Sequence, residues 1–205
     1  MSDDFNSPPR AASILPIARL QPVDAIPSTG ISVTVDASEA ELKAIAKLLG
    51  ILSVESLHAE LAAAREGDRV RVKGIVRAAA TQACVVTLDP VSETVDEAVE
   101  VVFAPREEAE ALMRKAGLPD EDDIDRIGLD DVDFAAFDLD MLNNPDALPE
   151  PILDGAIDFG QIAYDALAVG LDPYPRKPGV VFEPPAEEEG FGSPFAALKS
   201  LKPKQ

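Results

Sequence analysis

Alternating and helical spacings of apolar residues divide the first half of the chain into predicted elements. Residues 31–35 alternate apolar and polar side chains, which is the period of a half-buried strand. Ser38 and Glu41 then have the spacing of a capping box, and apolar residues recur every three or four positions after them. Gly50 suits the left-handed conformation in which helices often end. The pattern predicts a strand over 31–35 and a helix over 38–49.

The clearest alternation follows a turn at Glu66-Gly67-Asp68 and predicts a strand over 69–78. A second strand-like run covers 81–88, where Asp89-Pro90 is expected to stop it. The valine-rich run 91–103 predicts a third strand, with a bulge near Asp96-Glu97.

Other segments give weaker patterns. Residues 14–28 alternate with interspersed prolines, which suits an edge strand or an extended segment. Residues 53–66 fit both a helix and a strand, and periodicity alone leans slightly to a helix. Residues 106–115 suggest a short helix, and Asp158 looks like the cap of a further helix that ends at Gly170.

Composition adds a strongly acidic character. The formal net charge of the 205 residues is −20, so the chain as a whole repels nucleic-acid phosphates. Between Asp120 and Asp154 there are thirteen acidic residues and one basic residue, Arg126, a density of like charge that opposes a compact core. The first ten residues lack a basic start and an apolar core, so we expect no signal peptide. No run approaches the ~18 apolar residues of a membrane span, and we expect a cytoplasmic protein that does not contact membranes.

Candidate chemistry is sparse. One cysteine, Cys84, and one histidine, His58, exclude an intramolecular disulfide and make a Cys/His zinc site very difficult to build. Cys84 lies in an apolar, strand-like run, so inert packing is favoured over a reactive thiol. No motif frames His58 as a general base, and a surface histidine is the preferred reading. We expect no catalytic residues, no metal and no cofactor.

Two segments that carry cations are candidate contact sites. The strand over 69–78 places four cations on one face, where they could touch RNA phosphates. A solvated face balanced by neighbouring acids is the favoured interpretation. Tyr174, Arg176 and Lys177 lie between prolines that stiffen the chain, so this stretch is either a docking element or a structural closing segment. The four strand cations are Arg69, Arg71, Lys73 and Arg77.

Three patches together resemble one protein family. They are Ala83 to Val91 (ACVVTLDPV), Ile157 to Gln161 (IDFGQ) running into Leu171 to Gly179 (LDPYPRKPG), and Ser193 to Lys202 (SPFAALKSLK). In this order and spacing they resemble the YceD family, the large ribosomal RNA subunit accumulation proteins, in an alphaproteobacterial form. The resemblance covers roughly residues 14–202, and it changes the expectation for 53–66 from helix to strand.

The resemblance implies a role in the accumulation of large-subunit ribosomal RNA without supplying a biochemical activity. Many relatives carry two cysteines three residues apart where this chain has Cys84 and Thr87, and an arginine where it has Val86. A single thiolate cannot complete a four-ligand zinc site, so metal or dithiol chemistry is not expected here.

We therefore expect one α+β domain over 14–182, with a largely antiparallel sheet that could curl into a barrel and two main helices. The expected appendages are a disordered start at 1–13, an acidic insertion at about 117–154, and a flexible tail at 183–205 with a short helical motif. In that motif Phe195, Leu198 and Leu201 share one helical face, which docks either on a partner or on the chain's own domain.

The favoured function is a non-enzymatic accessory factor in ribosome biogenesis. Its acidic surface would capture a basic ribosomal or assembly protein, and any contact with RNA would be indirect. The expected partner-binding residues are Tyr174, Arg176, Lys177, Phe195, Leu198 and Leu201. The alternative is an RNA-processing or RNA-modifying enzyme, which would need convergent groups in a pocket.

Overall fold

The computed structural model describes residues 15–118 and 144–182 and shows an α+β fold, as expected. A five-stranded sheet runs in the order β2-β3-β4-β5-β6, and a separate two-stranded ribbon pairs β1 with β7. All pairings are antiparallel except β5 with β6. The sheet is open rather than closed, so the barrel considered from the sequence is not formed. The strands are β1 (Leu20–Pro22), β2 (Ile31–Asp36), β3 (Ser53–Glu66), β4 (Arg69–Ala83), β5 (Pro90–Pro105), β6 (Glu150–Ile152) and β7 (Ala156–Asp158).

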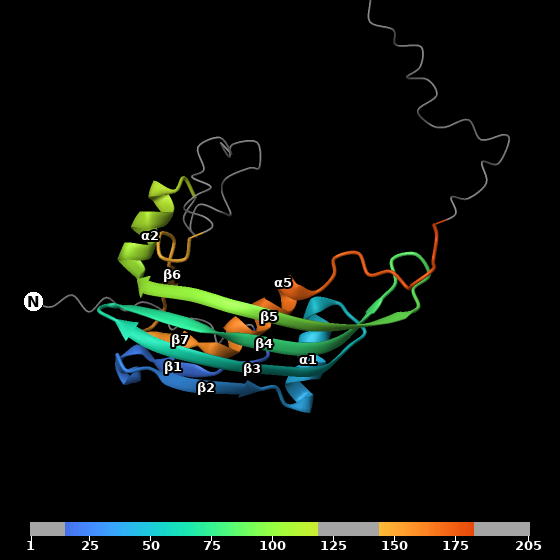
Figure 1. The fold of residues 1–205 in the computed structure, drawn as a ribbon, viewed down its shortest axis with the longest axis horizontal. Coiled ribbons are helices and arrows are strands. Elements are labelled where there is room, and N and C mark those ends of the chain that lie inside the picture. Colours follow the sequence, from blue (N-terminus) through green and yellow to red (C-terminus); the bar gives the residue numbers. More distant parts are fainter. Residues whose placement is uncertain (1–14, 119–143, 183–205) are drawn as a thin grey trace, which may run out of the picture.

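Three long strands dominate the molecule (Figure 1). β3, β4 and β5 have 14, 15 and 16 residues, and they pair along almost their whole length. Position 74 in β4 has no room for a side chain, because a Cβ on Gly74 would lie 2.1 Å from the carbonyl oxygen of Glu60 in β3. The curved sheet that results has one covered face and one open face.

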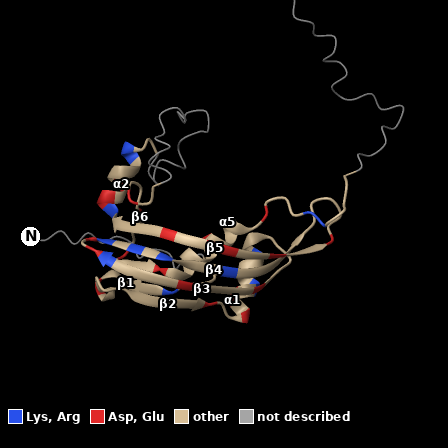
Figure 2. Ribbon diagram, viewed as in Figure 1, with Lys and Arg blue, Asp and Glu red and all other residues tan. Residues whose placement is uncertain are grey.

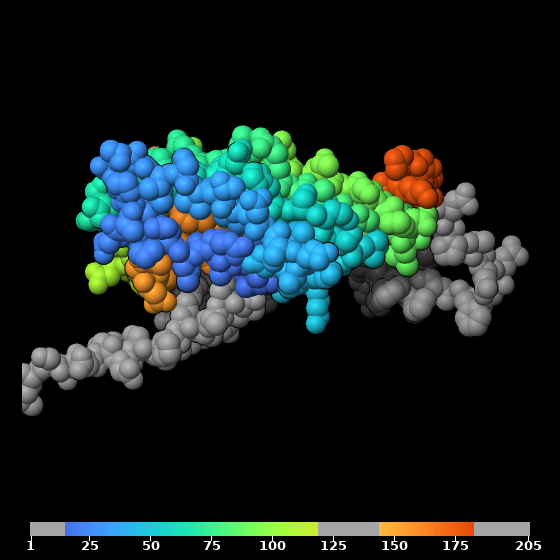
Figure 3. Space-filling view, turned by 90° about the horizontal axis from the view of Figure 1, so that it is seen from below, coloured from blue at the N-terminus to red at the C-terminus, as the bar shows by residue number. Residues whose placement is uncertain are grey.

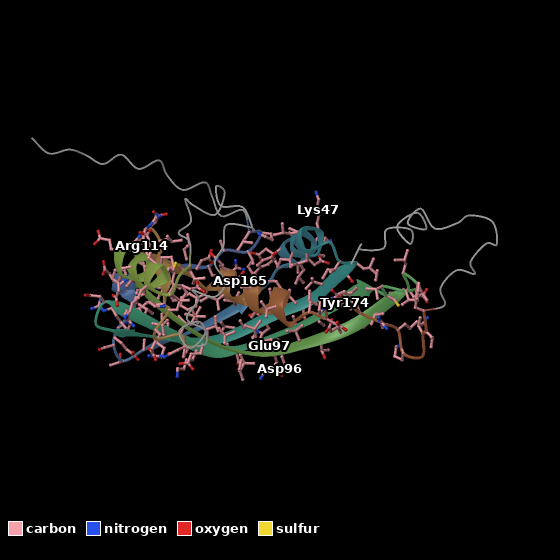
Figure 4. All side chains as sticks on the ribbon, turned by 90° about the horizontal axis from the view of Figure 1, so that it is seen from above. Lys47, Asp96, Glu97, Arg114, Asp165 and Tyr174 are labelled. Carbon is pink, nitrogen blue, oxygen red and sulfur yellow. The ribbon has the colours of Figure 1, made fainter. Side chains whose placement is uncertain are left out.

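Helices cover one face of the sheet. α5 (Phe159–Gly170) packs against β2, β3, β4 and β5, and α1 (Glu39–Leu49) packs against β3. Figure 4 shows both helices on the same side of the sheet. We call this the inner face, and the opposite side the outer face. α2 (Arg106–Lys115) follows β5, contacts β5 and β6, and stands at one end of the sheet.

The core fills the space between the inner face and the helices. Alternate residues of β3 and β4 point inward and are buried, as the alternating pattern predicts. Phe159 and Leu167 of α5 are fully buried against them. Each fully buried Leu or Phe side chain contributes roughly 1.5–3 kcal/mol to stability. The inward residues of β3 and β4 include Leu57, Ala59, Leu61, Ala63, Val70, Val72, Val76, Ala78 and Ala80.

Both main helices begin as the sequence predicts. Ser38 accepts a hydrogen bond from the Glu41 amide, and the Glu41 carboxylate accepts from the Ser38 amide. Gly50 closes α1 with φ of 68°, in the left-handed region. Asp158 caps α5 by accepting from the amides of Gly160 and Gln161. The same Asp158 carboxylate also accepts from the Arg19 amide, so it ties the segment before β1 to α5.

Three sequence expectations are corrected. Only residues 81–83 of the run 81–88 are strand, as the end of β4, and residues 85–87 form a turn. Asp89-Pro90 does not stop a strand but leads into β5. No bulge occurs near Asp96-Glu97, where the register with β4 is continuous, and the irregularity lies instead in β3 between Val54 and Ser56. Residues 53–66 form β3, which confirms the strand expected from the family resemblance, although their periodicity alone leans to a helix.

Candidate partner interface

Two segments that are far apart in the sequence meet at one end of the sheet. The first is the β4–β5 turn, residues 84–89, and the second is the segment after α5, residues 171–182. The Val85 amide donates to the Pro175 carbonyl at 2.9 Å, and the Lys177 ammonium pairs with the Asp89 carboxylate at 3.0 Å. Figures 1 and 3 show the two segments side by side. Two of the three patches that carry the family resemblance therefore form one surface.

The β4–β5 turn is held by its own backbone. The Cys84 amide donates to the Asp89 carbonyl at 2.8 Å, and the Leu88 amide donates to the Cys84 carbonyl at 2.9 Å. Leu88 adopts a φ of 63°, which is uncommon for a residue with a side chain, and its side chain is 77% exposed. The turn thus presents a leucine to solvent at some conformational cost.

Cys84 lies beneath this surface. Its side chain is fully buried, as expected, but it sits past the end of β4 among hydrogen-bond donors rather than within an apolar strand. The Lys177 amide donates to the Cys84 sulfur at 3.4 Å. This hydrogen bond, together with others from Thr87 and Val86, lowers the pKa of the thiol to about 6, because the donors outweigh the opposing effect of desolvation.

The exposed side of this surface carries apolar side chains together with positively charged ones. Tyr174 is 70% exposed, whereas the neighbouring Pro175 is buried and anchors the segment. Arg176 is exposed and makes no ion pair within the part of the chain that the structure describes. We call this surface the turn patch; it comprises Val85, Leu88, Tyr174, Arg176, Lys177, Val181 and Phe182.

The predicted partner-binding residues divide into two groups. Tyr174, Arg176 and Lys177 lie together on the turn patch, and Lys177 also serves the structure through Asp89 and Cys84. Phe195, Leu198 and Leu201 lie outside the described residues, as does most of the acidic segment at 117–154. Sequence reasoning missed Leu88, because its exposure depends on a left-handed turn.

The four cations of β4 are all neutralised. They lie on the outer face, where each pairs with at least one carboxylate. Figure 2 shows Lys and Arg positions of β4 between strands that carry Asp and Glu positions. The solvated, balanced face favoured from the sequence is thus what the structure shows. The pairs are Arg69 with Glu108, Arg71 with Glu66, Glu100 and Asp146, Lys73 with Glu100, and Arg77 with Glu60 and Asp96.

Carboxylates gather without cations on the opposite side of β5. Glu93 and Glu97 point to the inner face, where Glu97 lies beside the end of α5. Asp165 of α5 is close enough to Glu150 of β6 for their charges to interact. None of these four carboxylates forms an ion pair within residues 15–118 and 144–182. Partial desolvation and the neighbouring Asp165 raise the pKa of Glu150, as expected where like charges crowd together.

Within the described residues, the candidate catalytic and metal-binding side chains do not converge on one site. His58 hydrogen-bonds Asp36 at 2.7 Å on the outer face, far along β3 from the β4–β5 turn that holds Cys84. No group of three or more His, Cys, Asp or Glu side chains is arranged to hold a metal within the described part of the chain. Over the same residues, no helix has the length and apolar character required to cross a membrane.

Comparison with known proteins gives one match. A search of curated proteins and a search of solved structures each returned no match. A sequence model of the family described as "Large ribosomal RNA subunit accumulation protein YceD" matches residues 72–202, which run from within β4 through α5 and the turn patch. Because this match covers well over half of the 205 residues, the chain belongs to the YceD family of large ribosomal RNA subunit accumulation proteins.

Proposed function

We propose that the chain supports accumulation of large-subunit ribosomal RNA by binding a basic ribosomal or ribosome-assembly protein. Membership of the family supplies the connection to ribosomal RNA. The binding of a basic protein is our inference from the charges. With a formal net charge of −20, the chain attracts cationic partners at long range and accelerates their encounter.

The observation that carries the proposal is the unequal pairing of charges around β5. The cations of β4 are bound to carboxylates, so they offer little to an RNA phosphate. Glu97 and Asp165 have no cation beside them within the described residues, and both are exposed. The outer face therefore offers no free cations of β4 to RNA, whereas the unpaired carboxylates beside α5 fit a basic protein.

The turn patch supplies the apolar part of the proposed interface. Tyr174 and Leu88 are both mostly exposed on a segment that buried contacts hold in place. Tyrosine and arginine are the side chains that most often dominate binding energy at protein interfaces, and a pre-ordered segment loses less entropy on binding. Tyr174 and Arg176 are therefore the proposed anchor residues.

The alternative enzyme receives no support from the geometry. An RNA-processing site needs a nucleophile, a base and a space for substrate in one place. Cys84 is buried under the Lys177 amide, and His58 pairs with Asp36 on the outer face. The two residues therefore do not form a common site.

The proposal is tested by capture of the tagged full-length protein from cells that produce it. Bound proteins and RNA are identified with and without nuclease treatment. We expect a basic protein that is retained after nuclease and lost when Tyr174→Ala and Arg176→Ala are combined. The matched control is Lys47→Ala with Leu48→Ala, which removes an exposed cation and an exposed leucine from α1 instead.

Two results would overturn the proposal. One is a partner that is released by nuclease, which would mean that RNA is the direct ligand. The other is equal capture by the Tyr174/Arg176 variant, the Lys47/Leu48 control and the unmodified protein, which would remove the turn patch from the interface.

A further inference from the structure

β5 has a long open edge. One side of the strand pairs with β4 from Pro90 to Phe103, but on the other side β6 joins only at Phe103–Pro105. No backbone hydrogen bond from residues 91–101 to any described residue occupies this second side. Every second residue of a strand directs its N–H and C=O away from its neighbour, so this edge presents a row of unpaired donors and acceptors.

The edge is physically accessible. Asp96, Glu97 and Ala98 are three consecutive exposed residues, which requires that both faces of β5 be open at that point. The end of α5 packs beside the strand, where a Cβ on Gly170 would lie 2.5 Å from Val95 and 2.9 Å from Glu97. Gly170 thus lets the helix lie close to the inner face without extending over the edge. The Asp172 amide donates to the Glu93 carboxylate at 3.1 Å, so the segment after α5 approaches the beginning of the edge. The remaining residues, 95–101, span about 20 Å, enough for an added strand of about six residues.

Carboxylates border the edge on both faces. Figure 4 views the molecule from the side of β5 and labels Asp96 and Glu97 on this strand and Asp165 on α5. Asp96 and Glu100 lie in the outward set of β5 residues and already pair with the β4 cations. Glu97 lies in the inward set and forms no ion pair within the described residues. An added strand would direct every second side chain toward the inner face, where the carboxylates of Glu97 and Asp165 are unpaired within the described residues.

We propose that this edge of β5 accepts a lysine- or arginine-rich extended segment of a partner protein as an added strand. The inference rests on the proposed function, since it specifies how a basic partner binds. Backbone hydrogen bonds to the edge supply affinity, and alternate cationic side chains pair with the bordering carboxylates. The same arrangement selects against neutral or acidic segments.

A second copy of this chain is a poor occupant of the edge. Two β5 strands paired edge to edge would bring the acidic side chains of one strand against those of the other. Like charges directly opposite each other in a sheet are destabilising. The edge is consequently closed to self-association while it remains open to a cationic strand.

The test uses the full-length protein and a synthetic ten-residue peptide of alternating lysine and valine. A control peptide has the same sequence with alternate backbone nitrogens methylated, so it keeps its charge but cannot pair as a strand. Binding is followed by calorimetry, and backbone protection is followed by hydrogen exchange. We expect the first peptide to slow exchange within residues 91–101 by about tenfold, and the methylated peptide to give no such protection.

Charge-reversing variants locate the site independently. Glu97→Lys and Asp165→Lys each lie on the acidic border and have no ion pair to lose within the described residues. Each is expected to weaken peptide binding by about tenfold at low salt. Glu39→Lys on α1 makes the same charge change away from β5 and is expected to leave binding nearly unchanged. Melting temperatures confirm that each variant is folded.

The outcomes separate this inference from the proposed function. Protection of residues 91–101 that is lost in Glu97→Lys supports strand addition. Strand addition is overturned if the first peptide binds but slows amide exchange outside residues 91–101, or if the methylated peptide binds equally well. Either result still allows the proposed function, in which the chain binds a basic protein by another surface. Absence of binding by the first peptide overturns strand addition as well, and capture from cells then decides the proposed function. Concentration-dependent dimerisation with protection of β5 would make a second copy the occupant and would also overturn the proposal.

Discussion

At the scale of single residues, Cys84 shows how a buried thiol can serve as a hydrogen-bond acceptor. The Lys177 amide reaches its sulfur at 3.4 Å, and the Thr87 side chain bonds to the same sulfur. The thiol therefore helps to fasten the segment after α5 onto the β4–β5 turn. Its reactivity toward solvent reagents is limited by burial even though its pKa is lowered.

The lowered pKa of Cys84 predicts a pH-dependent contribution to stability. The pKa is about 6 in the folded protein and about 8.5 for an unfolded cysteine. A depressed folded pKa stabilises the protein fully above the unfolded value, and this contribution is lost as the pH falls toward 6. We expect the stability of the unmodified protein relative to Cys84→Ser to rise between pH 6 and pH 9. Urea unfolding of both proteins at several pH values measures this difference, and a constant difference would contradict it.

At the scale of elements, local signals predicted some segments fully and others not at all. The capping box and Gly50 defined α1 because the capping groups lie within a few residues of each other. For β3 the local periodicity alone leaned to a helix, and the family resemblance was needed to expect a strand, because its identity is fixed by pairing with β2 and β4 on its two sides. The strand expected over 81–88 failed for a related reason. The Val85 amide is satisfied by Pro175, a partner 90 positions away that periodicity cannot reveal.

The candidate interface was predictable to a similar degree. Tyr174, Arg176 and Lys177 stood out because of the prolines around them, and all three lie on the turn patch. The open edge of β5 was invisible in the sequence, because a strand's neighbours depend on the order of strands in the sheet. Residue type suggests a surface, whereas topology determines which backbone groups remain unpaired.

The capping box of α1 gives the element-scale prediction. Ser38→Ala removes the acceptor for the Glu41 amide, and we expect it to lower the free energy of unfolding by about 1 kcal/mol. The helix also depends on Glu41, which pairs with Arg19 at 2.8 Å from the segment before β1. Ser32→Ala, at an exposed position of β2, is the control and should change stability by less than about 0.5 kcal/mol. Equal unfolding curves for both variants would show that the cap contributes nothing.

At the scale of the whole molecule, net charge opposes compactness and favours association. A formal charge of −20 creates self-repulsion in the folded chain. On the outer face the β4 cations are neutralised by neighbouring carboxylates. Exposed ion pairs of this kind contribute little to stability. The net negative charge of the surface thus destabilises the folded chain, and it favours the binding of a positively charged partner.

This balance predicts that moderate salt stabilises the protein. Raising sodium chloride from roughly 20 mM to roughly 150 mM shortens the screening length to about 8 Å, which weakens repulsion between carboxylates. We expect a higher melting temperature at the higher salt and, over the same range, weaker binding of any basic partner. A melting temperature that falls with added salt would show that surface ion pairs outweigh self-repulsion.

The last prediction concerns the C-terminal motif, whose residues lie outside the described structure. The described chain ends at Phe182, on the turn patch, so the following ten residues can place Ser193 up to about 35 Å from it. Ser193 and Pro194 suit a helix start, and Phe195, Leu198 and Leu201 share one face of that helix. About ten residues form no stable helix alone, so the predicted helix would require packing on a partner or on the chain's own domain.

Truncation before Ser193 distinguishes these two possibilities. If the motif docks on a partner, the truncated protein keeps its melting temperature and loses association in cells. A full-length variant with Phe195→Ala, Leu198→Ala and Leu201→Ala is the matched control, because it keeps Lys199 and Lys202 while it removes the apolar face. We expect it to behave as the truncation does, since desolvation of the apolar face rather than charge would drive docking. A clearly lower melting temperature would place the motif on its own domain, and retention of every partner would remove it from the interface.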